Sequence, residues 1–257
     1  MQLFDVHCHL QDPRIAHQLE SVMHRAKRAG VYRMVCCGST EDDWDDVARI
    51  SQSWDGVLPA FGLHPWYVQG RREVWLQDLE TRIRSGIASI GEIGLDFFLD
   101  RTTHSDQEQV FAEQLRLAGK YGRPVSIHCR KAWGRLIEIV SADVNRAYGG
   151  IVHSYSGSVE MVHTLERLGF YLSFSGSVTR SNNKRARAAC RAVSDERLLI
   201  ETDSPDILPL EAGGGHNEPG NLVLVLRAVA EIRGWSEEKT AEITCENASR
   251  VFDETGN

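Results

Sequence analysis

The stretch Leu3-Phe4-Asp5-Val6-His7-Cys8-His9 is a short apolar run that ends in two histidines. Apolar runs of this length, with amphipathic stretches on their C-terminal side, are typical of β-strands in α/β proteins. Seven further runs of the same kind follow at 31–37, 57–63, 87–93, 124–129, 150–154, 170–175 and 198–202. The first run therefore opens a series of eight predicted strands.

Helical patterns separate the predicted strands, so strands and helices alternate along the chain. They lie at about 14–29, 41–53, 71–85, 106–121, 131–142, 158–168, 182–193 and 221–233, with a further one near 237–252. Eight alternations predict an α/β protein with a closed (β/α)8 TIM barrel, and such barrels commonly occupy about 250 residues as one domain. We therefore expect a single domain over residues 1–257. A doubly wound open sheet is the alternative, although no Gly-x-Gly-x-x-Gly turn follows the first run.

Composition limits the location and the partners of the protein. Hydrophobic residues make up 42% of the 257 residues, but no run of about 20 apolar residues and no signal peptide is visible. We therefore expect a cytoplasmic protein that does not associate with a membrane. We expect no obligate protein partner. The six cysteines show no regular framework, which favours reduced, buried thiols. A net charge of −7 argues against a broad surface for duplex DNA, so a polyanionic substrate would have to be held locally.

Polar side chains stand at the ends of the predicted strands, where a barrel of this kind carries its chemistry. Strand ends hold roughly a tenth of the residues of such a barrel, yet five of the ten histidines fall there. The residues at or directly after the runs are His7, His9, His64, Glu92, His128, His153 and Asp203.

Their spacing favours metal ligation. His7 and His9 are two positions apart in a strand, so they share a face while Cys8 points away from it. A buried carboxylate such as Glu92 is costly unless it is paired, and its two oxygens can bridge two cations. His128 and His153, each of which alone could be a hydrogen-bonded core histidine, would complete a second nitrogen and oxygen site with Glu92.

Asp203 follows the eighth run, in Leu199-Ile200-Glu201-Thr202-Asp203-Ser204-Pro205. It could be a metal ligand, a general base for the attacking water, or both. The alternative is a helix N-cap, a position that aspartate favours.

Taken together, these segments resemble the TatD family of metal-dependent deoxyribonucleases. The motifs occur in the family's order as Asp5-Val6-His7-Cys8-His9-Leu10, Gly62-Leu63-His64-Pro65, Gly91-Glu92-Ile93-Gly94-Leu95-Asp96, Pro124-Val125-Ser126-Ile127-His128-Cys129-Arg130, His153-Ser154-Tyr155-Ser156-Gly157, Glu201-Thr202-Asp203-Ser204-Pro205 and Asn217-Glu218-Pro219. The resemblance covers nearly the whole chain. It implies that His7, His9, Glu92 and Asp203 hold one metal, that Glu92, His128 and His153 hold the other, and that His64 lies near the substrate phosphate.

Two positions depart from the family pattern. Val6 replaces the usual threonine of the first motif, and we expect its side chain to point outward, away from the ligands. His216 stands where a basic residue often precedes the Asn-x-Pro element. The departures leave all six expected ligands in place.

The predicted reaction is hydrolysis of a phosphodiester by a water that two divalent cations activate. Asp203 and His64 are the expected catalytic residues, and His64 or Arg130 would contact a non-bridging oxygen. For Arg130 the alternative is a salt bridge at the barrel rim.

Imidazole and carboxylate ligands suit Zn, Mn or Fe, and the resemblance adds Mg. The substrate is expected to be DNA or another phosphodiester. The alternatives are hydrolysis of a small amide, lactone or phosphotriester, and a non-catalytic binding barrel.

Four basic residues after the seventh run recur at helical spacing. Arg180, Lys184, Arg187 and Arg191 would form one stripe on a helix, opposite Ala186, Ala189, Cys190 and Val193. The stripe could be an ordinary solvated face. In the functional interpretation, Arg180 and Lys184 lie nearest the barrel mouth and bind phosphates of an entering strand.

Overall fold

A computed structural model describes residues 1–84, 86, 88–142 and 149–253. Three parts of the expectations lie outside the described residues. They are position 85, at the end of the expected helix at 71–85, position 87, at the start of the expected strand at 87–93, and the last four residues of the expected domain. Eight parallel strands form one sheet in sequential order. They are β1 (Leu3–Cys8), β2 (Val31–Cys37), β3 (Val57–Phe61), β4 (Ser89–Asp96), β5 (Val125–Arg130), β6 (Gly150–Val152), β7 (Phe170–Phe174) and β8 (Leu198–Ile200).

The two outer strands of the sheet meet through hydrogen bonds just beyond β8. The Asp203 amide donates to the His7 carbonyl at 3.0 Å, and the His9 amide donates to the Ser204 carbonyl at 2.8 Å. The buried Asp5 carboxylate also accepts from the Thr202 amide at 2.9 Å and from its hydroxyl at 2.5 Å. The (β/α)8 TIM barrel is thus confirmed, and the open-sheet alternative is wrong.

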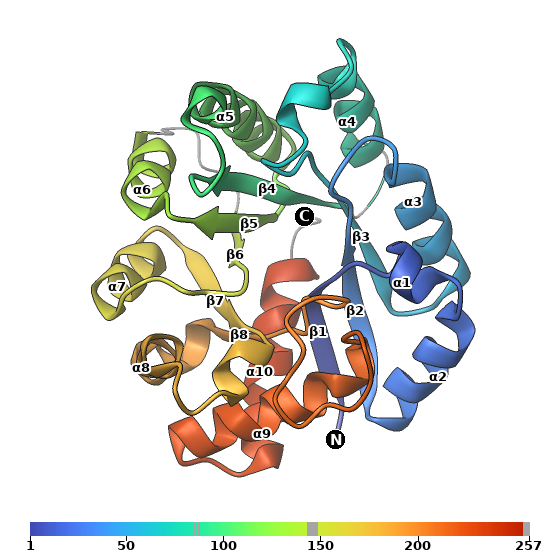
Figure 1. Ribbon diagram of the computed structural model, residues 1–257, viewed down its shortest axis with the longest axis vertical. Coiled ribbons are helices and arrows are strands. Elements are labelled where there is room, and N and C mark those ends of the chain that lie inside the picture. The colour runs from blue at the N-terminus through green and yellow to red at the C-terminus, as the bar shows by residue number, and fades with distance from the viewer. Residues whose placement is uncertain (85, 87, 143–148, 254–257) are drawn as a thin grey trace.

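Helices surround the ring of strands, as Figure 1 shows. Their bounds are α1 (Pro13–Ala16), α2 (Leu19–Arg28), α3 (Trp44–Ser53), α4 (Trp75–Arg84), α5 (His104–Tyr121), α6 (Trp133–Ala142), α7 (Val159–Arg167), α8 (Lys184–Ala192), α9 (Leu222–Arg233) and α10 (Glu237–Phe252). Short 3-10 turns lie at Val68–Gly70, Arg101–Thr103, Gly176–Thr179, Asp195–Arg197 and Pro219–Asn221. The helix expected at 14–29 is in fact two helices, because Gln18 leaves the helical region with φ −131° and ψ 27°.

Several strands end earlier than the apolar runs suggested. The runs at 57–63, 150–154 and 198–202 stop pairing at Phe61, Val152 and Ile200, whereas β4 continues to Asp96. His153 and Asp203 therefore lie just beyond their strands. Because β1 ends at Cys8, the same holds for His9.

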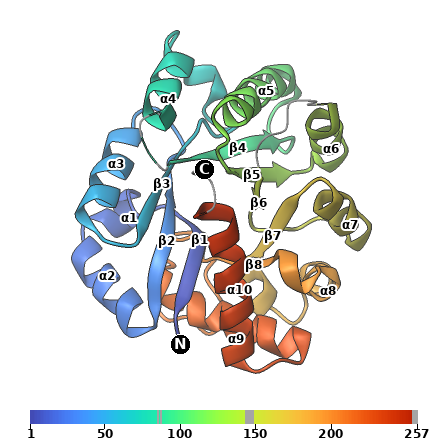
Figure 2. The same ribbon diagram turned by 180° about the vertical axis from the view of Figure 1, so that it is seen from behind.

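Helix α10 closes one end of the barrel, as Figure 2 shows. Its Ala248, Val251 and Phe252 pack with interior residues of several strands. These interior residues are Phe4, Val6, Val35, Cys37, Ala60, Ile151 and Leu199. This end of the barrel is filled almost entirely by apolar side chains.

Val6 points into the barrel, so the expectation that it faces outward is wrong. Asp5 pairs with Met34 and Cys8 pairs with Cys36. Between these two pairs, β1 has two residues and β2 has only one. One additional residue on β1 resets the side-chain alternation there. Val6 and His7 can therefore both lie inside.

Two further expectations concern cysteines and membranes. Five of the six cysteines are buried and Cys245 is half-buried. Across the described ranges, no helix is long and apolar enough to cross a lipid bilayer.

Candidate metal centre

The expected ligands converge at the carboxyl ends of the strands. His7 lies in β1 and His9 directly after it, Glu92 in β4, His128 in β5, and His153 and Asp203 just after β6 and β8. His7 is fully buried, while His9, His128 and Asp203 keep 12–17% of their side chains exposed. Solvent therefore reaches the cluster past these three residues.

One oxygen of Glu92 faces a first group of donors. Its Oε2 lies 3.5 Å from His7 Nε2 and 3.4 Å from His9 Nε2. The two imidazole nitrogens are 3.2 Å apart. Asp203 Oδ1 lies 3.8 Å from His7 Nε2 and 3.7 Å from His9 Nε2. Two nitrogens and two carboxylate oxygens are thus close enough to share one cation.

The other oxygen of Glu92 faces a second group. Its Oε1 lies 2.8 Å from His153 Nε2, 3.0 Å from His128 Nδ1 and 3.2 Å from His64 Nε2. The rings of His7 and His153 stack at 3.9 Å with an angle of 9°, which joins the two groups side by side. The Glu92 carboxylate therefore lies between two adjacent sets of donors.

The far nitrogen of each expected histidine ligand has a polar neighbour. His9 Nδ1 donates to the Cys37 carbonyl at 2.8 Å, and His128 Nε2 lies 3.4 Å from Asp96 Oδ2. His153 Nδ1 lies 3.4 Å from Glu201 Oε1. In His9 and His128, donation to an oxygen on one side of the ring leaves the other nitrogen unprotonated and free to bind a metal. His153 Nδ1 makes no hydrogen bond within the described residues. His7 Nδ1 is 2.8 Å from the Ser126 hydroxyl, which can play either role.

His64 differs from these four histidines. Its Nδ1 accepts the backbone N–H of Trp66 at 3.2 Å, so the neutral ring carries its proton on Nε2. Burial lowers the pKa of His64, which favours that neutral form. Its Nε2–H therefore faces the cluster as a hydrogen-bond donor and not as a ligand, although His64 lies within ligand distance of Glu92 and His128.

The charges in the cluster strongly perturb one another. Burial lowers the pKa of His7 to about 4. Burial also acts to lower the pKa of His9, but the Asp203 and Glu92 carboxylates outweigh it and raise that pKa well above its usual value. Burial would raise the pKa of Glu92, yet the surrounding histidines bring it well below its ordinary range. Anionic carboxylates beside nitrogen donors form a favourable place for a cation.

Asp203 is held in a left-handed backbone conformation, with φ 57°. This region is unfavourable for residues other than glycine, and such strain is found mainly at functional sites. The chain from Asp203 to Glu218 is described and no helix begins in it, so the N-cap alternative for Asp203 is wrong. The backbone instead directs the side chain toward His7 and His9.

Gly62 allows β3 to approach Glu92 closely. A Cβ atom at Gly62 would lie 2.7 Å from the Gly91 carbonyl carbon and 2.8 Å from the Glu92 carbonyl oxygen. Contacts this short would push the backbone of β4 away. The glycine in the Gly62-Leu63-His64 segment thus has a packing role beneath the cluster.

Two carboxylates next to the cluster, Asp96 and Glu201, were not predicted from the sequence to take part in the site. Asp96 is buried, and hydrogen bonds from His128, Trp66 and the Phe98 amide outweigh burial and lower its pKa to about 2. Glu201 is fully buried beside His153. A signal was present, because Asp96 lies four positions after Glu92 and Glu201 two positions before Asp203. In a continuous strand, residues at such even spacings would share a face, although Glu201 and Asp203 in fact lie beyond the end of β8.

Of the expected substrate-binding residues, His64 is buried within the cluster, whereas the three basic residues Arg130, Arg180 and Lys184 are exposed at the rim. The Arg130 guanidinium lies 4.0 Å from the centre of the Phe98 ring, which is a cation–π contact. Among the described residues, Arg130 does not form the salt bridge considered as the alternative. Arg180 donates to the Leu208 carbonyl at 3.1 Å, in the loop after Asp203. Lys184 is the first residue of α8.

The four basic residues after β7 do not form one solvated stripe. Arg180 precedes α8, which starts at Lys184 after the Asn183 cap. Arg187 pairs with Glu231 at 2.6 Å, and Arg191 donates to the Ile232 carbonyl at 3.3 Å, so both are bound to α9. The opposite face is buried as expected, at Ala186, Ala189, Cys190 and Val193.

Comparison with known proteins decides the family. A family model described as TatD related DNase matches residues 4–253. The chain belongs to the TatD family. This places it among the metal-dependent hydrolases, and the fold and ligand-type residues agree with that placement.

Members of the TatD family match over nearly their full length. The uncharacterized metal-dependent hydrolase YabD of Bacillus subtilis is 34% identical, covering 97% of this chain and 98% of the relative. The 3'-5' ssDNA/RNA exonuclease TatD of Cronobacter sakazakii is 28% identical, with 97% of both chains covered. The crystal structure of the TatD homologue YjjV of Escherichia coli superposes with a TM-score of 0.92 at 26% identity, covering 98% of both chains.

Proposed function

We propose that this hydrolase cleaves phosphodiester bonds of nucleic acid, as a deoxyribonuclease-type enzyme that uses two divalent cations. The observation that carries the proposal is the position of Glu92, whose two oxygens face two separate groups of donors at 2.8–3.5 Å. A carboxylate in this position suits a pair of cations better than a single one.

The donors present fit such a pair. His7, His9, Glu92 and Asp203 would hold one cation, and Glu92, His128 and His153 would hold the other. Nitrogen and oxygen donors of this kind suit Mn or Zn, while Mg is a candidate through the family resemblance. When bound, the cations would supply Lewis-acid chemistry, lowering the pKa of water and neutralising charge on phosphoryl oxygens.

The remaining polar groups have roles that follow from their positions. The Asp203 carboxylate lies at the exposed side of the cluster, where it can orient the attacking water and take up its proton. The His64 Nε2–H can donate to a non-bridging phosphate oxygen, since its other nitrogen is fixed by Trp66. Arg130 can contact a second oxygen from the rim.

Two relatives support nucleic acid as the substrate. One is the Cronobacter exonuclease on single-stranded DNA and RNA, and another is the human deoxyribonuclease TATDN3, which is 30% identical over 97% of this chain. The net charge of −7 fits a substrate that is held at the mouth and not across a broad basic face.

The test is a substrate panel with purified protein that has been stripped by a chelator and reloaded with Mn, Zn or Mg. We expect reloaded protein to hydrolyse single-stranded DNA or RNA, and stripped protein to be inactive. The panel also includes a small amide, a lactone and a phosphotriester. Hydrolysis of one of these with no cleavage of any nucleic acid would overturn the proposal.

A further inference from the structure

Exposed aromatic side chains gather beside the metal centre. In the described residues, the largest exposed aromatics are Tyr32, Trp66, Tyr67 and Phe98, and Trp66 and Phe98 are 53% and 64% exposed. Trp66 and Tyr67 follow β3 and Phe98 follows β4, so three of the four lie on adjacent loops at the mouth. Single exposed aromatics are common, but a group next to a candidate site points to a ligand.

The Asp96 carboxylate fixes two of these aromatics relative to the cluster. Its Oδ2 accepts the Trp66 indole N–H at 2.7 Å, and its Oδ1 accepts the Phe98 amide at 3.0 Å. The same carboxylate lies 3.4 Å from His128 Nε2. The Trp66 ring also meets the His64 ring edge-on at 5.1 Å. The aromatics are therefore held one side chain away from the residues expected to bind metal and phosphate.

Phe98 carries a cation on its ring. The Arg130 guanidinium lies 4.0 Å from the ring centre, and both side chains are exposed. An aromatic face together with an arginine is the combination by which proteins bind single-stranded nucleic acid, since the ring stacks on a base and the cation contacts the backbone. An amide or lactone substrate gives no reason for this pairing.

We propose that Trp66 and Phe98, with Arg130, form an aromatic shelf that stacks on an unpaired base next to the scissile phosphate. The inference rests on the proposed nuclease function and adds the residues that would hold the base next to the cleaved bond. Stacking on a shelf requires a base whose face is free, so single strands and frayed ends fit and an intact duplex end does not. Because every base has a flat face, the shelf would favour no particular sequence.

The experiment uses reloaded protein and short single-stranded DNA in which one abasic nucleotide is moved through every position. For the wild type we expect a base near the cleaved bond to lower KM relative to the abasic strand by roughly fivefold to a hundredfold, the range that stacking of one base provides. Phe98→Ala should remove most of that difference and Phe98→Trp should restore it. Tyr32→Ala is the control, since Tyr32 is an exposed aromatic at the start of β2, at the opposite end of the barrel.

The outcomes separate the two proposals. Cleavage by the wild type with the same abasic penalty in Phe98→Ala would overturn the shelf and leave the nuclease function standing. No cleavage of any strand by reloaded wild type would overturn both. Loss of the abasic penalty in Tyr32→Ala as well would show that the effect does not come from the mouth, and this too would overturn the shelf.

Discussion

The two ends of the barrel interior differ in the side chains that the same strands place there. At one end Phe4, Val6 and Leu199 pack against Val251 and Phe252 of α10. At the other end β1 presents His7, and the chain beyond β8 presents Asp203. Burying apolar side chains stabilises the fold, whereas burying carboxylates and imidazoles costs free energy unless they find partners. One end should therefore control stability and the other should control chemistry.

The largest expected effect is the loss of metal on changing Glu92. Glu92→Ala removes the carboxylate that faces both groups of donors, so we expect the metal content to fall from about two cations per chain to below one, with loss of hydrolysis. Elemental analysis after dialysis in excess Mn or Zn measures this. Glu80→Ala is the matched control, because Glu80 pairs with Lys120 at the surface. Equal metal content in both variants would remove Glu92 from the centre.

The opposite end should respond in stability alone. Phe252→Ala removes a ring that is 5% exposed and lies 5.8 Å from the ring of Phe4. Truncation of a buried phenylalanine costs about 3–5 kcal/mol, so urea denaturation should shift to much lower concentrations. Metal content per folded chain should stay at the wild-type value. If Phe252→Ala lost metal while its free energy of unfolding stayed at the wild-type value, the proposed difference between the two ends would be wrong.

Within the mouth, Asp203 should affect turnover more than folding. Asp203→Asn keeps the shape and one oxygen donor but removes the charge needed to accept a proton, so kcat should fall by at least ~10²-fold. Steady-state kinetics with metal content measured in parallel checks this. Near wild-type turnover with metal bound would give Asp203 a purely structural role.

A smaller effect is expected from the carboxylate behind His153. Glu201→Gln keeps the volume and the acceptor for the Ser154 amide, which lies 2.7 Å from Glu201 Oε1, but removes the charge beside His153. Changes to such outer partners typically weaken metal binding about 10- to 100-fold. A titration should show one of the two cations bound more weakly. Loss of the cation on the side of His7 and His9 instead would contradict the assignment of His153.

The barrel and the clustering of the expected ligands could be predicted because each rests on a repeated local pattern. Eight apolar runs, six of which have such a polar residue at or directly after their ends, were enough to place His7, Glu92 and His128 at one end. The direction of Val6 could not be predicted, because a single additional residue on β1 relative to β2 reverses the alternation. The role of Asp96 depends on contacts with Trp66 and His128, which are distant in sequence. The separation of Arg180 from α8 likewise depends on the Asn183 cap, which the spacing of basic residues does not reveal.

The smallest expected effect concerns the basic residues at the rim of the mouth. Arg180 and Lys184 are exposed, and Arg180 contacts the loop after Asp203, so both can contact phosphates of a strand that enters the metal centre. Each phosphate contact should add roughly 0.7 to the salt slope of single-strand binding. Arg180→Glu with Lys184→Glu should therefore weaken oligonucleotide binding and flatten its salt dependence, while hydrolysis of a small phosphodiester stays nearly unchanged.

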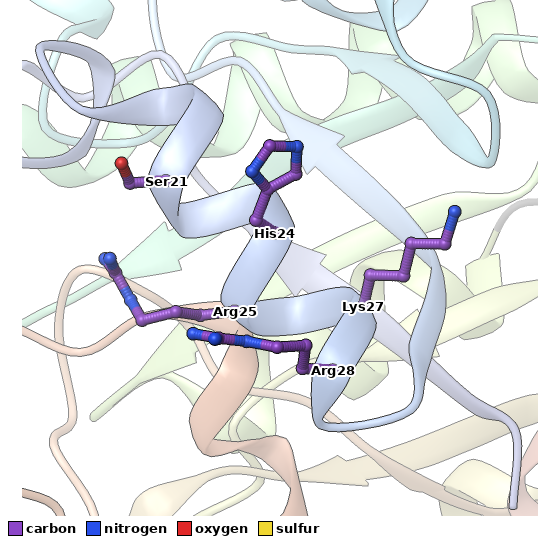
Figure 3. Close-up of a pocket in the computed structure, with 5 residues that line it drawn as sticks. All are labelled: Ser21, His24, Arg25, Lys27 and Arg28. Atoms are coloured by element: carbon purple, nitrogen blue, oxygen red, sulfur yellow. The ribbon is translucent and has the colours of Figure 1, made fainter.

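The matched control is Lys27→Glu with Arg28→Glu, which alters the net charge equally. These two residues line a hollow on α2 (Figure 3), at the end of that helix which leads into β2 and thus away from the mouth. If both double variants change the salt slope alike, the effect comes from net charge alone. If neither changes it, the rim residues lie outside the substrate path, and recognition of the strand falls to groups nearer the metal centre.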